Sequence, residues 1–444
     1  MSLLAELAGF VSDADIAALP REERAAAADH FCDGMAAILA GLRTSDAAVL
    51  RRLAGQATWP ERTGLISAAT RLTEIDDIHL PSCVTPTAVA MPVALSIAIS
   101  QTSADPRELA SAIWAGTELM TRLGEALSGP DILYRGIWPT YLVAPVGAAA
   151  VSCRLLRLDR TQATHALSLA LMLASGGIGQ FRGNPSGRWF IFAMAVAQGI
   201  RAALAAREGM VGDAALLDGA WFKTARGLDI NAALLSDVRA SRSVYSRLSL
   251  KPYCSSKQCI ASIEALKDIL GSGVAPDAIS HITVRVPPPY AAMIRTKASP
   301  EARLSMLVSV AHQLAVTAYQ PKTLYEVDRR PPSDPRLGVF ADKVEVVAEP
   351  ELQALYPMHW PAELEVIAGG QSHRRRVISA KGDPACPLSA AEIEHKAHAV
   401  LDGAMGRGEV SRWMAAARAG FDDKQGCGEL LRLYAEETAA WEFK

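Results

Sequence analysis

The spacing of apolar residues predicts helices over nearly all of the chain up to about residue 250. Apolar positions recur three and four residues apart, and glycine or proline interrupts this pattern only at wide intervals. Three stretches are apolar on every side, and a helix without a polar face is normally buried. We expect these stretches to form the core of a helical domain: residues 87–100, 141–153 and 189–206.

Beyond residue 250 the spacing of apolar residues changes from the helical period to the alternation typical of strands. Residues 281–286 and 343–347 alternate between apolar and polar side chains, as half-buried strands do. Two further alternating stretches lie on either side of Gly369-Gly370, which is typical of a hairpin turn. This part of the chain therefore reads as a small α+β domain.

Helical spacing returns from Pro387 onward, where Ser389 and Glu392 are spaced as in a capping box. We therefore expect a mainly α protein with an α+β insertion. The expected parts are a large all-helical domain, residues 1–248 with the returning helices 387–444, and a smaller α/β lid, residues 249–386.

Acidic residues cluster in the polar loop before the first of the buried stretches. Glu74, Asp76, Asp77 and His79 fall within six residues, and like charges this dense repel unless they are solvated, paired or protonated. Thr85-Pro86 then has the form of an N-cap followed by proline at the first helical position. Asp76 and Asp77 could act in catalysis. Alternatively their role is structural, and they cap the helix or pair with an arginine.

Polar loops also precede the other two buried stretches. One loop carries Arg135 and Trp138, and the other ends in Arg188. Three such loops could converge on one interior pocket, which helix N-termini and arginines would make attractive to anions. Alternatively they are plain connections whose arginines reach water.

A lysine stands in an unusual position at the start of a further helix. Pro252 stiffens the segment that carries Lys251, and Ser255 with Gln258 has the spacing of a capping box. Lys257 then falls in the first turn, where the helix dipole favours negative charge. The pattern indicates a carboxylate or phosphate site built from both lysines, or else an ordinary surface lysine beside an ordinary cap.

Composition narrows the class of protein. The net charge of the 444 residues is −2, without the excess of basic residues that nucleic-acid binding requires. No apolar run reaches the length of a membrane span, and the N-terminus lacks the basic start of a signal peptide. The seven cysteines include no C-x-x-C pair, and Gly176 to Gly179 match no nucleotide-binding loop. We expect a cytoplasmic protein that uses no metal and no cofactor.

Several motifs, in order along nearly the whole chain, resemble the MmgE/PrpD family. Its members include dehydratases, decarboxylases and epimerases of small carboxylic acids. The resemblance implies a helical domain made from both chain ends, a smaller lid, a homodimer, no cofactor and an active site between the domains. The motifs are D-D-x-H-x-P-S (Asp76 to Ser82), R-G-x-x-P-T (Arg135 to Thr140), K-P-Y (Lys251 to Tyr253), E-A-R-x-S (Glu301 to Ser305), D-P-R-L (Asp334 to Leu337) and G-D-P-x-x-P-L-S (Gly382 to Ser389).

The chain departs from the family pattern mainly by losing histidines. Thr85 and Trp138 stand where the family usually has histidine, and Arg188 stands where it commonly has lysine. A family aspartate is matched by Glu74. Most imidazoles are therefore gone while cations remain, so the chain resembles a divergent member of the family. Because Trp138 adds apolar surface, we expect a less charged or bulkier substrate.

The chemistry that the resemblance implies needs a carbanion or enolate beside a carboxylate, a group that moves a proton, and cations that hold the substrate. We expect a cofactor-free lyase or isomerase acting on a small carboxylate; the alternative is a non-catalytic homologue that binds a metabolite or a protein partner. The candidates for catalysis are Lys251, His79, Asp76 and Asp77. The candidates for substrate binding are Glu74, Thr85, Arg135, Trp138, Arg188, Tyr253 and Lys257.

Overall fold

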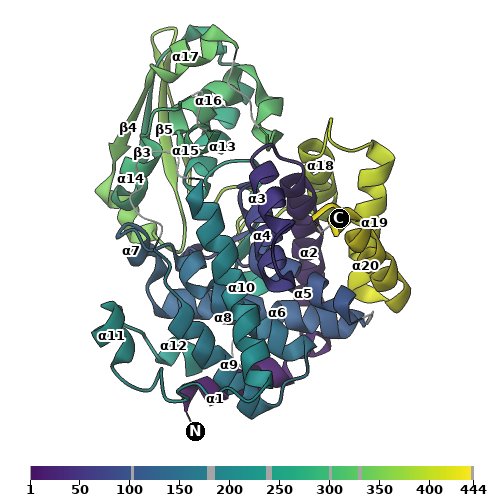
Figure 1. The fold of residues 1–444 in the computed structure, drawn as a ribbon. Coiled ribbons are helices and arrows are strands. Elements are labelled where there is room, and N and C mark those ends of the chain that lie inside the picture. The colour runs from purple at the N-terminus through teal and green to yellow at the C-terminus, as the bar shows by residue number, and fades with distance from the viewer. Residues whose placement is uncertain are drawn as a thin grey trace. The chain divides into compact units, whose positions relative to one another are not determined.

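The computed structural model describes residues 2–101, 105–177, 186–236, 243–299, 303–328 and 333–441. The protein is mainly α-helical, with a small α/β portion (Figure 1). The chain divides into two compact units. The helical unit comprises Met1–Leu72, Asp76–Leu248 and Leu401–Lys444, and the mixed unit comprises Thr73–Ile75 and Ser249–Val400.

The core of the helical unit forms around α10, which packs against α4, α8 and α9. As predicted, α5, α8 and α10 are largely buried. Close packing needs glycine here, because a Cβ at Gly64 would lie 2.1 Å from the Ala193 carbonyl oxygen and one at Gly199 2.1 Å from that of Pro145. The helices of this unit are α1 (Leu3–Asp13), α2 (Arg21–Leu42), α3 (Ala47–Ala54), α4 (Trp59–Arg71), α5 (Thr87–Ser100), α6 (Pro106–Ala126), α7 (Gly129–Leu133), α8 (Pro139–Leu155), α9 (Arg160–Leu173), α10 (Gly187–Arg207), α11 (Trp221–Arg226), α12 (Ala233–Ser236), α19 (Arg407–Asp422) and α20 (Lys424–Thr438).

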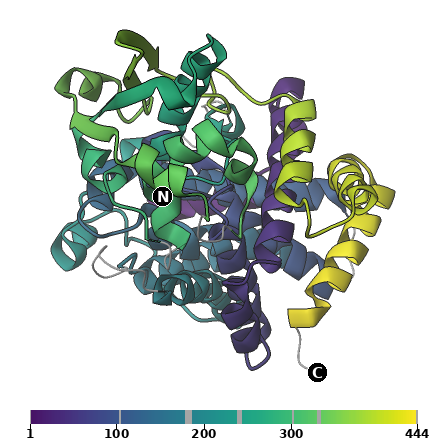
Figure 2. The same cartoon turned by 90° about the horizontal axis from the view of Figure 1, so that it is seen from above.

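The C-terminal helices join the N-terminal ones. Helix α19 lies beside α2 (Figure 2), where Arg418 pairs with Asp29 at 2.7 Å and the ring centroids of Phe31 and Phe421 are 5.6 Å apart. A two-stranded sheet pairs β1 (Ile78–His79) with β2 (Leu248–Ser249).

Helix α18 (Ala390–Val400) belongs to the mixed unit, so the chain returns to the helical unit at Leu401 and not at residue 387 as expected. Another boundary between the two units falls after Leu248. Side-chain contacts explain the difference at the return: Glu392 pairs with Lys381 at 2.9 Å, and the ring of His395 lies 6.0 Å from that of Tyr325. The capping box of Ser389 and Glu392 forms as predicted.

The mixed unit contains a four-stranded sheet in the order β4-β3-β5-β6. β3 pairs with β4 in parallel and with β5 antiparallel, and the predicted hairpin joins β5 to β6 through Gly369 and Gly370, whose φ values are 56° and 79°. Two helices, α15 and α16, follow one another closely and are separated at Ser309, which caps the second. The bounds are β3 (Ile279–Val286), β4 (Val344–Ala348), β5 (Ala362–Ala368), β6 (Gln371–Val377), α13 (Lys257–Gly271), α14 (Pro288–Ile294), α15 (Arg303–Val308), α16 (Val310–Tyr319) and α17 (Pro335–Ala341).

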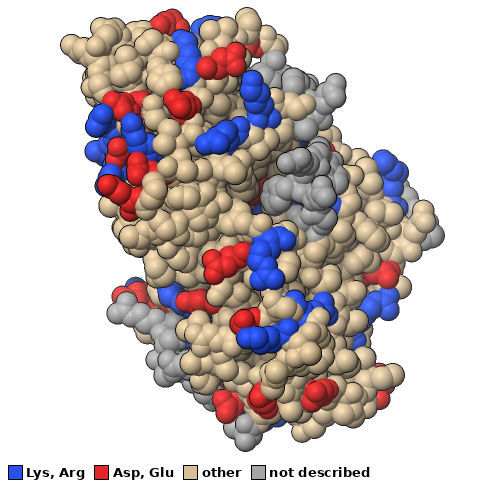
Figure 3. Space-filling model, turned by 90° about the vertical axis from the view of Figure 1, so that its left-hand side faces the viewer, with Lys and Arg blue, Asp and Glu red and all other residues tan. Residues whose placement is uncertain are grey.

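The two faces of this sheet differ in polarity. Leu364 and Val366 of β5 are buried, whereas Glu365 pairs with Arg285 at 2.9 Å and with Arg374 at 2.8 Å. Charged side chains of both signs accordingly lie close together in the upper part of Figure 3. Such exposed pairs contribute little stability individually, but charges on β6, at the edge of the sheet, discourage pairing with another strand.

One helix in the described part of the chain, α10, is long and apolar enough to span a membrane. This corrects the expectation that no apolar run has that length, because Arg201 interrupts the apolar run without making the helix polar. Most of α10 is buried within the structure, as in the core helix of a globular domain. The expected cytoplasmic location stays a prediction.

Candidate active site

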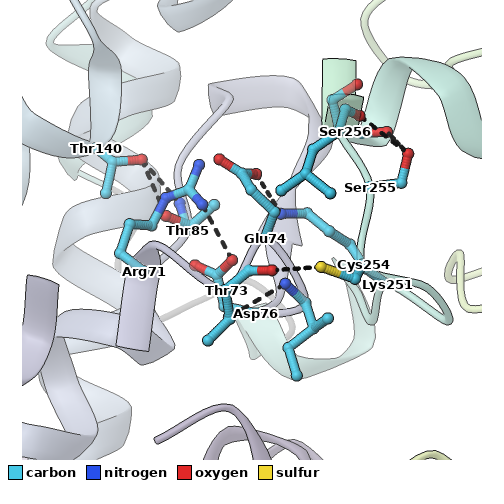
Figure 4. A network of polar contacts seen from close by, with 12 residues as sticks. Arg71, Thr73, Glu74, Asp76, Thr85, Thr140, Lys251, Cys254, Ser255 and Ser256 are labelled. Carbon is cyan, nitrogen blue, oxygen red and sulfur yellow. Dashed lines mark hydrogen bonds and ion pairs between the residues drawn. The ribbon is translucent and has the colours of Figure 1, made fainter. Parts of the chain in front are cut away.

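Lys251 and Glu74 form a buried pair in the mixed unit (Figure 4). Nζ of Lys251 lies 3.4 Å from Oε2 of Glu74, and the two side chains are only 2% and 6% exposed. Glu74 has a φ of 58°, a left-handed conformation that is uncommon for a residue other than glycine and is held only where the surrounding structure fixes it. The pair therefore occupies a defined position away from water.

Each of the three residues Thr73, Glu74 and Ile75 contacts a residue from the Ser249–Val400 segment of the mixed unit. Cys254 Sγ donates to the Thr73 carbonyl at 2.8 Å, Lys251 meets Glu74, and Lys396 Nζ donates to the Ile75 carbonyl at 2.9 Å. These contacts explain why Thr73–Ile75 cluster with the mixed unit although the residues on either side belong to the helical unit.

A second buried pair lies beside Lys251 in the sequence. Lys257, the first residue of α13, pairs with Asp383, which also accepts hydrogen bonds from Ser249 Oγ and, at 2.8 Å, from the Ala380 amide. The Leu250 amide donates to the Gly382 carbonyl at 2.9 Å. The segment around Asp383 thus fixes the chain on both sides of Lys251.

The start of α13 differs from the prediction. Ser256 is the N-cap residue and its side chain makes no capping bond, so the predicted capping box of Ser255 and Gln258 is wrong. Ser255 Oγ donates instead to the carbonyls of Ser256 and Leu307, at 3.2 and 3.4 Å. The carboxylate that meets Lys257 comes from the protein itself, and the pattern needs no bound ligand there.

The two aspartates of the acid cluster make structural contacts in the helical unit. Asp76 is fully buried and pairs with Arg71 at 3.2 Å (Figure 4). Asp77 accepts hydrogen bonds from the Thr87 amide at 3.2 Å and from Thr87 Oγ1 at 2.6 Å, so it supports the first turn of α5. His30 Nδ1 lies 3.7 Å from Asp77 Oδ2.

Thr85 does not cap α5 as predicted. Its amide and hydroxyl both meet Thr140 Oγ1, at 3.0 and 3.2 Å, which ties this loop to the first turn of α8. The helix begins at Thr87 instead, with Asp77 as its acceptor.

His79 is a neutral imidazole in the interior of the helical unit. Burial, together with the positive charges of Arg247 and Arg122, lowers the pKa of His79 well below its usual value. Nδ1 lies 2.9 Å from Ser82 Oγ, and Nε2 has no hydrogen-bond partner in the part of the chain that the structure describes. A neutral ring with a free nitrogen could accept a proton.

Trp138 and Arg188 come together, but Arg135 does not join them. The guanidinium carbon of Arg188 lies 4.0 Å from the centroid of Trp138 and 4.6 Å from that of Trp189, and the arginine is buried. Arg135 is exposed on the surface, where it reaches the Gly227 carbonyl at 3.4 Å. The loop of residues 178–185 lies outside the described residues.

Tyr253 is committed to neighbours within the mixed unit. Its hydroxyl donates to Glu264 at 2.5 Å and accepts from Lys267. Burial and the charge of Glu264 raise the pKa of Tyr253 far above its usual value, so the phenol keeps its proton.

The sequence did not predict the residues whose buried contacts hold the candidate site residues in position. Asp383, Arg71 and Lys396 each hold a candidate residue or its segment through a buried contact. The Gly382-Asp383-Pro384 motif was the only available signal, since nothing local tells which distant cation an acid will meet. Within the described residues, no three side chains of His, Cys, Asp or Glu are grouped as metal ligands, and all seven cysteines are free.

Comparison with known families covers most of the chain. The model of the MmgE/PrpD N-terminal domain matches residues 63–227, and that of the MmgE/PrpD C-terminal domain matches residues 253–419. No curated protein matches the chain significantly. The two matches follow one another in the order of the family, and the chain belongs to the MmgE/PrpD family.

Proposed function

We propose that this protein is a lyase or isomerase that acts, without a cofactor, on a small molecule bearing a carboxylate. The MmgE/PrpD family includes lyases of the dehydratase type, so its membership indicates dehydratase-type or related activity. The observation that carries the proposal is the buried pair of Lys251 and Glu74. Buried titratable pairs that the structure fixes in place are common where enzymes move protons.

Elimination, decarboxylation and epimerisation next to a carboxylate all pass through a carbanion or enolate. Lys251 can serve this step in two ways. It can remove the substrate proton while its own proton rests on Glu74, or it can stay charged and hold the substrate carboxylate. The separation of 3.4 Å is longer than that of a strong charged hydrogen bond, which supports a pair that can exchange partners when substrate arrives.

His79 is the second candidate for proton transfer. Its neutral ring and its unpartnered Nε2 among the described residues support a role as a base. Asp76 and Asp77 are weaker candidates for proton transfer than His79, because both already bind groups of the protein. Asp76 pairs with Arg71, and Asp77 accepts hydrogen bonds from Thr87 at the start of α5.

The test is turnover of a panel of small carboxylic acids, followed by mass spectrometry in deuterated water. Loss of water, loss of carbon dioxide or uptake of deuterium beside the carboxylate would each identify a reaction that starts from the same carbanion. The Lys251→Met variant serves as the control for contaminating activity. Binding of acids with neither turnover nor deuterium uptake would contradict the proposal and favour a non-catalytic homologue, a role that Thr85 and Trp138 support by standing where the family usually has histidine.

We also propose that the protein is a homodimer. Three large apolar side chains, two in the last turn of α9 and one in the first turn of α10, are nearly half exposed: Met172 at 48%, Leu173 at 46% and Phe190 at 47%. Exposed apolar groups that form one patch often mark an interface between protein chains.

A further inference from the structure

Two long helices that the structure describes, α13 and α10, begin with a buried cation. Lys257 is the first residue of α13 and Arg188 the second residue of α10, positions where the helix dipole disfavours positive charge. Within the mixed unit, Asp383 compensates Lys257. In the helical unit, no carboxylate of the described residues pairs with Arg188.

The contacts of Arg188 are aromatic and neutral. Its guanidinium lies over Trp138 and Trp189, and its Nε donates to the Tyr141 hydroxyl at 3.5 Å. Nη2 is buried and has no hydrogen-bond partner among the described residues, although the side chain as a whole is only 5% exposed. Residues 178–185, which precede α10 in the sequence, contain neither Asp nor Glu.

A buried cation without a counter-ion is unfavourable, because it loses its hydration and gains little in return. The other buried cations that the structure describes have polar partners that offset this loss. Arg71, Arg122, Lys251 and Lys257 pair with carboxylates, and Arg303 and Lys396 donate to backbone carbonyls. Arg188 stands apart from this pattern, and its geometry fits an anion that comes from outside.

The aromatic contacts define which anion fits. Two indole rings lie close to the guanidinium carbon. The N–H groups of a guanidinium lie in its plane and match the two oxygens of a carboxylate. Trp138, Tyr141 and Phe192 form a continuous aromatic cluster beside it, with ring centroids 5.6 and 4.9 Å apart. Apolar surface of this kind favours an uncharged group next to the carboxylate.

We propose that Arg188 binds the carboxylate of a monocarboxylate substrate whose remaining body is uncharged. This inference rests on the proposed function and names the class of its substrate. One uncompensated cation balances one carboxylate, and a di- or tricarboxylate at this subsite would bury further negative charge without a partner.

The test is a binding titration by isothermal titration calorimetry, with butyrate as the probe. Butyramide has a similar shape without the charge, and tricarballylate carries three carboxylates. We expect saturable binding of butyrate and a dissociation constant at least tenfold higher in Arg188→Met. Equal binding of butyramide, tighter binding of tricarballylate, or unchanged butyrate affinity in Arg188→Met would overturn the proposal.

Thermal unfolding separates a binding arginine from a structural one. Arg188→Met removes an uncompensated charge and should leave Tm unchanged or raise it, whereas the matched variant Lys257→Met leaves Asp383 buried without its cation and should lower Tm. A loss of Tm in Arg188→Met as large as that in Lys257→Met would contradict the proposal. Since neither experiment needs turnover, butyrate binding through Arg188 together with no turnover and no deuterium uptake in the whole panel of acids would refute the proposed function alone.

Discussion

Lys257 and Asp383 form a buried ion pair although they are 126 residues apart in the chain. Asp383 also accepts from Ser249, and the neighbouring Gly382 accepts from the Leu250 amide. The segment that carries Lys251 is therefore fixed at both of its ends by one short stretch of chain. The position of the candidate proton-transfer group depends on this second, purely structural pair.

Breaking that pair should destabilise the protein. Lys257→Met leaves a buried carboxylate without its cation, for which we expect a loss of about 3 kcal/mol or more in the free energy of unfolding. Urea denaturation of the whole protein, followed by fluorescence and circular dichroism, measures this loss. Lys267→Met, which removes a half-exposed lysine of the same helix, is the control, and an equally small effect of both variants would show that the buried pair contributes nothing.

Two features of Gly382 favour glycine over any other residue, and a comparison with Gly403 separates their effects on stability. It has a φ of 90°, and a Cβ on it would lie 1.9 Å from the Leu250 carbonyl oxygen. Gly403 has a similar φ of 75° but open space around its Cβ position. Gly382→Ala should therefore lower Tm clearly more than Gly403→Ala, which carries only the backbone strain. Similar Tm values for the two variants would mean that the close approach to Leu250 is not important.

The stability of the helical unit should depend on His79 at acid pH. Burial lowers the pKa of His79 in the folded state, so below the ordinary histidine value of about 6.5 the unfolded chain binds a proton that the folded chain does not. This contribution is fully present above that pH and is lost as the pH falls toward the folded pKa. Unfolding free energies of wild type and His79→Gln, measured from pH 7.5 down to about 5, should converge as the pH falls. Parallel curves would show that His79 titrates normally.

Sedimentation at micromolar concentration should show a homodimer. If the apolar side chains at the ends of α9 and α10 form the interface, Leu173→Lys should shift the protein toward monomer. Val339→Lys, at an exposed apolar position of α17, is the control and should leave the dimer intact. A wild-type protein that sediments only as monomer would refute the dimer.

The sequence predicted features that depend on neighbours along the chain. The buried helix α5 and the hairpin at Gly369 and Gly370 follow from local apolar spacing and from glycine's tolerance of positive φ. The strand β3 follows from the alternation of apolar and polar residues over 281–286. These signals need no knowledge of distant contacts.

Features that depend on distant partners were not predictable in this way. Asp77 and Thr85 both precede α5, and only the fold shows that Asp77 supports the helix while Thr85 bonds to Thr140. The same holds for Lys257, whose partner Asp383 lies 126 residues further along the chain. Sequence reasoning recognised the unusual cation but not the acid that compensates it.

The measurement that tests the central claim most directly is kcat/KM of Lys251 variants on the acid that the wild type converts. Lys251→Met should lower kcat/KM by about a hundredfold or more, as expected for loss of a general base or of a charged clamp. Lys251→Arg keeps the charge but cannot release its proton at working pH, so it should be as inactive as Lys251→Met if Lys251 is the base. A near-normal kcat in Lys251→Arg would make Lys251 an anchor and move the base to His79. Full activity of Lys251→Met would contradict the account.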